Sequence, residues 1–122
     1  MKLTKKALDG NMETLLLAVL SDGPSYGYQL VQDLNAKAPG VLKTGEGTIY
    51  PVLHRLEERG LIQSQWREGE TGRQRRYYRL SPKGKKALSA NRQQWAALTK
   101  VMGAVLGPLP APESLLIQPR PE

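Results

Sequence analysis

Apolar residues recur at helical spacing along the first part of the chain. Residues 11–21 carry one such stripe, which the Asp-Gly-Pro turn at residues 22–24 ends because proline cannot continue a helix. A second helix is predicted over residues 25–37, with Ser25 as its N-cap. Glycine inside a helix is less favourable than alanine by up to about 1 kcal/mol, and a close approach of another backbone segment would explain why Gly27 is tolerated there. The apolar face of this helix is expected to comprise Tyr28, Leu30, Val31 and Leu34.

A third helix is predicted over residues 46–59, with one apolar side and Gly60 at its C-terminal end. Pro51 lies inside this helix and removes one backbone hydrogen bond, so we expect a bend there. Helical spacing leaves the opposite, mixed polar face exposed to solvent. This face comprises Gly47, Pro51, His54 and Glu58, with Tyr50 and Arg55 at its flanks.

Strand-forming residues follow the third helix and predict a β-hairpin. Successive side chains of residues 62–67 alternate in the way expected for the two faces of a strand. Residues 73–80 form the predicted return strand, with two adjacent tyrosines. The segment between them contains two glycines and is the expected turn. Ser81 and Pro82 then suit the N-cap and the first turn of a fourth helix.

The last helix carries apolar residues at alternating spacings of three and four, which is the heptad pattern of a helix that packs against another helix. This seam comprises Leu88, Asn91, Trp95, Leu98, Met102 and Val105. The pattern predicts self-association, and packing within the same chain is the alternative. Residues 107–122 are rich in proline and are expected to be disordered.

These elements predict a mainly α fold with a β-hairpin, which is the layout of a winged helix-turn-helix. A length of 122 residues suits one domain with a modest core. We expect a DNA-binding domain over residues 1–80, a dimerisation helix over residues 81–106 and the proline-rich tail over residues 107–122.

The charge of the chain is concentrated in one segment, within a net charge of +7. Residues 1–61 hold seven basic and seven acidic residues, whereas residues 62–92 hold nine basic residues and two acidic ones. A localised basic surface indicates a polyanionic partner, although it could also be merely solvated. An arginine-rich hairpin beside an exposed helix favours double-stranded DNA, and an RNA-binding winged helix is the rival hypothesis.

Other classes of protein find little support. The chain has no cysteine, which excludes disulfides and thiolate metal sites and fits a cytoplasmic protein. No apolar run reaches the length of a membrane span, and the N-terminus lacks the apolar region of a signal peptide. The single histidine has no evident nucleophile to activate, so we expect no enzyme activity, no cofactor and no metal.

Three blocks of the sequence resemble the PadR-like family of transcriptional regulators. The blocks are residues 25–30, which read Ser-Tyr-Gly-Tyr-Gln-Leu, residues 47–62, which begin with Gly-Thr-Ile-Tyr-Pro-Val-Leu-His, and residues 72–84, which begin with Gly-Arg-Gln-Arg-Arg-Tyr-Tyr. They keep the family's order and spacing, and the resemblance covers roughly residues 8–105. It implies a homodimer that binds an inverted-repeat operator, dimerises through its last helix and usually represses transcription. The family pattern also carries a proline at the place of Pro51.

Candidate DNA contacts lie on the third helix, just before it and on the hairpin. Arginine binds phosphate oxygens with two parallel hydrogen bonds, whereas Tyr50 and His54 share one side of the helix and could reach bases or phosphates. Packing against the second helix is the alternative for Tyr50, and a plain surface position is the alternative for His54. The candidate set is Tyr26, Lys43, Thr44, Thr48, Tyr50, His54, Arg73, Arg75 and Arg76.

Trp95 marks a second candidate site, on the last helix. It resembles a tryptophan that lines a pore between subunits in the multidrug-responsive branch of the family, although Thr99 replaces the acidic residue that would favour a cation. Paired indoles across a twofold axis favour flat apolar ligands, so a planar aromatic effector is expected. The candidate ligand residues are Trp95, Leu98, Thr99 and Met102. The alternatives are a tryptophan that only fills the dimer core and a regulator without an effector.

Overall fold

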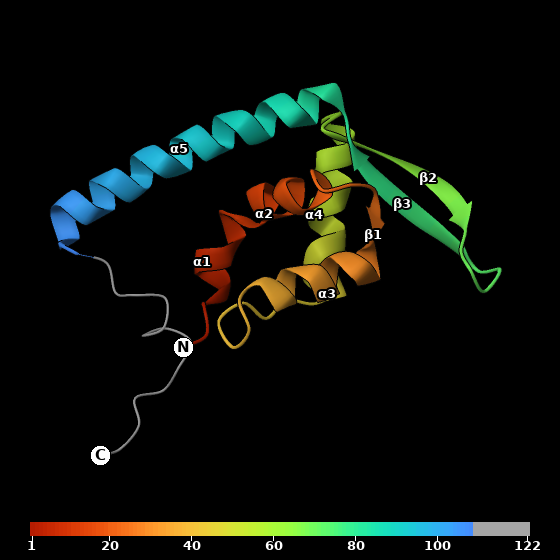
Figure 1. The fold of residues 1–122 in the computed structure, drawn as a ribbon, viewed down its shortest axis with the longest axis horizontal. Coiled ribbons are helices and arrows are strands. Elements are labelled where there is room, and N and C mark those ends of the chain that lie inside the picture. Colours follow the sequence, from red (N-terminus) through yellow and green to blue (C-terminus); the bar gives the residue numbers. More distant parts are fainter. Residues whose placement is uncertain (109–122) are drawn as a thin grey trace, which may run out of the picture.

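The computed structural model describes residues 1–108 and has the predicted mainly helical architecture with a long last helix (Figure 1). The elements are α1 (Lys5–Asp9), α2 (Met12–Leu20), β1 (Ser25–Tyr26), α3 (Gly27–Lys37), α4 (Glu46–Glu58), β2 (Ile62–Glu68), β3 (Gln74–Leu80) and α5 (Pro82–Leu106). The predicted disordered tail lies outside the described residues from position 109 onward.

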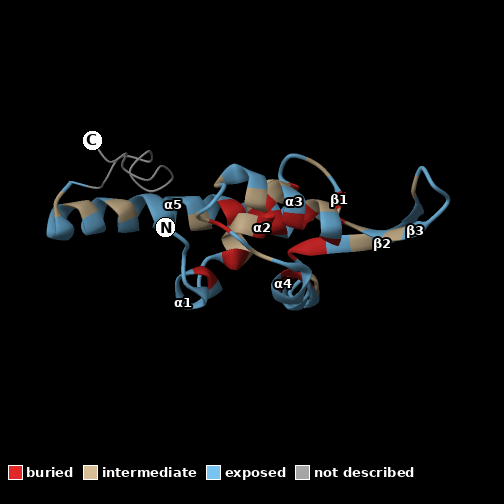
Figure 2. Ribbon diagram, turned by 90° about the horizontal axis from the view of Figure 1, so that it is seen from below, coloured by how far each residue is buried: buried red, intermediate tan, exposed pale blue. Residues whose placement is uncertain are grey.

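The core lies where α2, α3 and α4 pack together beneath the start of α5 (Figure 2). Met12, Leu16, Leu30, Ile49 and Leu53 are at most 1% exposed. Each such side chain contributes about 1.5–3 kcal/mol when it leaves water. The apolar sides predicted for the first and third helices are therefore confirmed.

The beginnings of the first two predicted helices differ from expectation. A short helix, α1, precedes α2, and the hydroxyl of Thr4 caps it by accepting a hydrogen bond from the Ala7 N–H at 3.1 Å. The prediction that Ser25 caps the second helix is wrong, because Tyr26 occupies the N-cap position of α3. Ser25 is instead buried and pairs with Tyr78 across the sheet, so strand pairing replaces capping.

The first turn of α3 also differs from the prediction. Tyr28 is 57% exposed and does not belong to the buried face that contains Leu30 and Val31. The reason is its position in the first turn, where it faces a cavity beside the hairpin instead of the core. Gly27 is buried, and the group that approaches it closely is the ring of Tyr50, not a backbone segment.

The sheet has three strands, because β1 joins the predicted hairpin in the antiparallel order β1-β3-β2. Tyr26 opposes Tyr77, and Ile62 opposes Leu80 at the base of the hairpin. The turn between β2 and β3 contains Gly72 at a φ of +78°, a conformation that side chains disfavour. The hairpin, which we call the wing, projects away from the helices (Figure 1).

Ser81 caps α5 as predicted and also fixes the start of the helix on the domain. Its hydroxyl accepts a hydrogen bond from the Gly84 N–H at 3.0 Å and donates one to the Gly60 carbonyl at 2.6 Å. The later turns of α5 extend beyond the other helices (Figure 1). Within residues 1–108 no helix, α5 included, combines the length and hydropathy needed to cross a membrane.

Candidate nucleic-acid interface

The exposed face of α4 carries three of the predicted DNA contacts. Thr48, Tyr50 and His54 are all exposed, and the helix continues through Pro51 without interruption. His54 Nε2 lies 2.8 Å from Glu58 Oε1, one turn further along. Such an exposed pair contributes little to stability, but it aligns the imidazole along the outer face of α4.

Tyr50 both packs against α3 and faces solvent. Its ring covers the space above Gly27, while 44% of the residue remains exposed. Partial burial is the main cause that raises the pKa of Tyr50 above its usual value of 10.0, and the nearby Glu46 carboxylate is the second. The hydroxyl therefore stays protonated at neutral pH and can donate a hydrogen bond.

The loop before α4 is held by Asn35 of α3. The Asn35 side chain accepts a hydrogen bond from the Thr44 N–H at 2.8 Å and donates one to the Thr44 carbonyl at 3.0 Å. This clamp positions the neighbouring Lys43, which is exposed. The Thr44 hydroxyl is buried without a hydrogen-bond partner among the described residues, so its side chain does not point to the surface.

Arg76 connects the wing to α4. Its Nη2 lies 3.0 Å from Glu57 Oε1, and its Nε donates to Ser64 Oγ at 2.9 Å. The Ser64 hydroxyl in turn donates to the other carboxylate oxygen of Glu57. Part of the Arg76 charge is therefore compensated inside the protein.

Arg75 lies on the opposite face of the wing, in a stack of two arginines and two tyrosines. Strand register places Tyr26, Tyr77, Arg67 and Arg75 on one face, while Arg76 lies on the other. The guanidinium of Arg75 is 4.4 Å from the Tyr26 ring centroid, and that of Arg67 is 4.3 Å from the Tyr77 centroid. The two rings meet edge-on at 5.3 Å. Each cation–π contact contributes about 0.5–1 kcal/mol at exposed sites, so the stack stiffens the wing.

Arg73 differs from both of the other predicted wing arginines. It lies in the turn region just before β3, is exposed, and takes part in none of the ion pairs formed within residues 1–108. Its charge is therefore fully available to an anionic partner.

An open cavity of about 660 Å³ brings several predicted residues together between the wing and the first turns of α3 and α4. It is lined by Tyr26, Gly27, Tyr28, Glu46, Tyr50, Trp66, Arg73, Gln74, Arg75, Arg76 and Tyr78. Lys43, Thr44, Thr48 and His54 do not line it. Tyr28 and Trp66 were not among the predicted contact residues, although the hairpin register that pairs Trp66 with Arg76 was a usable signal for Trp66.

The predicted seam of α5 divides into two parts. Leu88 is buried in the core, and Asn91 Nδ2 donates to Thr14 Oγ1 of α2 at 3.0 Å, so both serve packing within the chain. Trp95, Leu98 and Met102 remain exposed, and Thr99 is half-buried. The free part of the seam therefore begins at Trp95.

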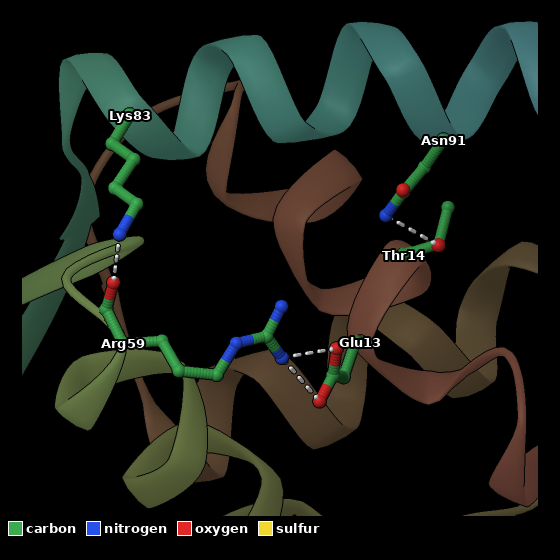
Figure 3. A network of polar contacts seen from close by, with 5 residues as sticks. All are labelled: Glu13, Thr14, Arg59, Lys83 and Asn91. Carbon is green, nitrogen blue, oxygen red and sulfur yellow. Dashed lines mark hydrogen bonds and ion pairs between the residues drawn. The ribbon is translucent and has the colours of Figure 1, made fainter.

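Polar contacts attach the first half of α5 to the helical domain (Figure 3). Lys83 Nζ donates to the Arg59 carbonyl at 2.9 Å, and Arg59 Nη1 donates to both carboxylate oxygens of Glu13, at 2.8 and 3.0 Å. The Asn91–Thr14 hydrogen bond continues this network along α2. These contacts set the direction in which the free half of α5 leaves the domain.

Comparison with known proteins identifies the family. Residues 16–90, from α2 into α5, match the transcriptional regulator PadR-like family. The chain belongs to the PadR-like family of transcriptional regulators. The fold of this PadR-like chain is accordingly a winged helix-turn-helix, and its activity is DNA binding in transcriptional regulation, not enzymatic catalysis.

Relatives of this PadR-like chain include the transcriptional regulator Rv3488 of Mycobacterium tuberculosis, which is 39% identical over 87 residues, covering 71% of this chain and 75% of that protein. The crystal structure of a PadR-like transcriptional regulator from Bacillus cereus superposes with a TM-score of 0.75 at 30% identity, covering 86% of this chain and 100% of that one. A transcriptional regulator from Clostridium thermocellum has the same TM-score and identity, covering 84% and 96%.

Proposed function

We propose that this PadR-like protein is a homodimeric repressor that binds an inverted-repeat operator. The observation that carries the proposal is the row of exposed apolar residues on α5. It comprises Trp95, Leu98, Val101, Met102, Val105 and Leu106, which are 43–77% exposed. A contiguous apolar surface of this kind indicates a protein interface, and a second copy of the chain supplies a self-complementary one.

In the proposed complex, each protomer places α4 in the major groove of one half-site. Thr48, Tyr50 and His54 face the groove, and Lys43 lies beside the N-terminus of the same helix. Two recognition helices related by a twofold axis read two inverted half-sites about one turn of DNA apart. Residues 1–80 then form the DNA-binding unit and residues 81–106 the dimerisation helix.

The test compares duplexes with one half-site and with two inverted half-sites, obtained by selection from random DNA. A homodimer binds the double site far more tightly, with two chains per duplex, and it lowers transcription in vitro when that site overlaps a promoter. Equal affinity for single and double sites would contradict the dimeric mode, and increased transcription would contradict repression.

The wing arginines are proposed to contact the DNA backbone in different ways. Arg73 takes part in no ion pair within residues 1–108, and the stacked guanidinium of Arg75 keeps its N–H groups available for phosphate. The chief contribution of Arg76 is to hold the wing against α4 through its ion pair with Glu57, in addition to any phosphate contact that it makes. Tyr26 acts by supporting Arg75.

Replacing Arg73 and Arg75 with alanine is expected to weaken binding to operator and unrelated DNA alike. The slope of log affinity against log salt concentration should fall by about one for each lost phosphate contact. Fluorescence anisotropy of labelled duplexes at several salt concentrations measures this slope. Lys86→Gln, which removes an exposed charge outside the wing, is the control. An unchanged slope combined with lost sequence preference would contradict the phosphate assignment.

We further propose a planar aromatic effector between the two α5 helices of the dimer, at Trp95, Leu98, Thr99 and Met102. The exposed indole of Trp95 supports this, because two such rings facing each other across the twofold axis offer stacking surfaces. A ligand held between the helices alters their spacing and therefore the distance between the two recognition helices.

Trp95 fluorescence is expected to be quenched by flat aromatic dyes in a saturable way, and Trp95→Ala is expected to abolish the quenching. Trp66, which is also exposed, is the other tryptophan of the chain, so the titration is performed in a Trp66→Phe background as well. Quenching that survives Trp95→Ala but disappears in Trp66→Phe would place the dye at the wing and refute the proposed site.

A further inference from the structure

Part of the basic segment lies away from the proposed DNA interface. Arg79 at the end of β3, and Lys85 and Arg92 on α5, line an open cavity of about 560 Å³. The cavity lies between these elements, the end of α2 and the turn that precedes β1, at the base of the sheet. No residue of α4 or of the wing tip lines it. The proposed operator contacts therefore leave these three positive charges unexplained.

The three cations have no anionic partner within residues 1–108. None of them takes part in the ion pairs of this part of the chain, and no carboxylate lines the cavity. Asp22, in the adjoining turn, lines a neighbouring cavity instead. Like charges that surround one hollow repel each other, and an anion bound among them relieves this repulsion.

The rest of the lining is apolar or carries a hydroxyl. Leu20 and Leu88 are buried and form part of the wall, together with Leu80 and Pro24. The hydroxyl of Ser89 adds a hydrogen-bond donor. Pockets of roughly 300–1,000 Å³ that combine apolar walls with a few polar groups are typical of small-molecule sites.

We propose that this cavity binds a small organic anion, namely a carboxylate or a phosphate ester with a short apolar body. The guanidinium groups of Arg79 and Arg92 hold the charged head with paired hydrogen bonds, and Lys85 adds a point charge. The leucine wall covers the apolar body. The site is separate from the wing and from the exposed stripe of α5, so it stands independently of the proposed function.

The test uses aliphatic probes, because aromatic ones could also bind at Trp95. Calorimetric titrations with hexanoate and butyl phosphate are expected to show saturable binding of one molecule per chain, and the tighter of the two identifies the head group. Inorganic phosphate should bind more weakly, because it leaves the leucine wall uncovered, and hexanol should not bind. The absence of saturable binding by both organic anions would overturn the proposal, and would mean that the cations only compensate the carbonyl end of α2.

Two variants in α5 locate the site. Lys85→Gln and Arg92→Gln each remove one lining charge at an exposed position and are expected to weaken probe binding about tenfold. Lys86→Gln is the matched control, because Lys86 is exposed on the same helix and does not line the cavity. Circular dichroism confirms that each variant is folded.

Three outcomes of this series would overturn the proposal. Equal weakening by Lys86→Gln would show that only the overall charge matters. Unchanged binding in both lining variants would exclude the cavity. Loss of probe binding in Arg75→Ala, with Lys85→Gln unaffected, would place the anion on the wing.

Discussion

Leu98→Glu is expected to convert the proposed dimer into folded monomers and to lower operator affinity about a hundredfold or more. Leu98 lies in the middle of the exposed apolar stripe, between Trp95 and Met102. A carboxylate there is desolvated in the interface, and the twofold axis brings a second one close to it. Light scattering after gel filtration measures the mass, and anisotropy measures DNA affinity.

Gln93→Glu is the matched control for this prediction. It adds one negative charge to the same helix, on the side away from the stripe by helical spacing. The control protein should remain dimeric and keep most of its affinity. A Leu98→Glu protein that stays dimeric would show that the apolar stripe of α5 is not the interface.

Gly84→Ala is expected to destabilise the folded domain by about 3 kcal/mol. A Cβ at this position would overlap the backbone carbonyl group of Leu61 and come within 3.3 Å of a Leu80 methyl group. The carbonyl cannot move aside easily, because it accepts a hydrogen bond from the Ser81 N–H at 3.1 Å, and the Ser81 hydroxyl is itself bonded to Gly60 and Gly84. The loss should appear as a lower midpoint in urea unfolding.

The control for this second prediction is Gly47→Ala, in the first turn of α4. A Cβ there meets nothing within 4 Å, so the stability should change by less than about 1 kcal/mol. If Gly84→Ala unfolds at the same urea concentration as the parent, the first turn of α5 is not held tightly against Leu61.

The three wing arginines illustrate how tertiary contacts separate residues that look equivalent in sequence. Arg73, Arg75 and Arg76 are close neighbours with the same side chain. Strand alternation places Arg76 toward Glu57 of α4 and Arg75 toward Tyr26 on the other face, while Arg73 forms no ion pair in the described part of the chain. Their expected contributions to DNA binding differ for that reason.

Helix positions and the core were predictable, because they depend on local spacing. The apolar stripes of α2 and α4, the Ser81 cap and the wing follow from patterns within a few residues of each other. The environments of Ser25 and Tyr28 were predicted wrongly. Ser25 pairs with the distant strand β3, and Tyr28 faces the cavity between the wing and the first turns of α3 and α4. Local propensity carries no information about a strand some fifty residues away.

The heptad pattern by itself determined that α5 needs an apolar partner, but not which one. Only the tertiary structure assigned Leu88 and Asn91 to α2 of the same chain and left the stripe from Trp95 onward uncovered. The charge pattern likewise identified a basic segment, and the fold divided it between the wing and the cavity that contains Arg79. Periodicity and composition indicate which apolar side chains need a packing partner and which charged side chains need a counter-charge. How the elements pack then decides which group is the partner of each.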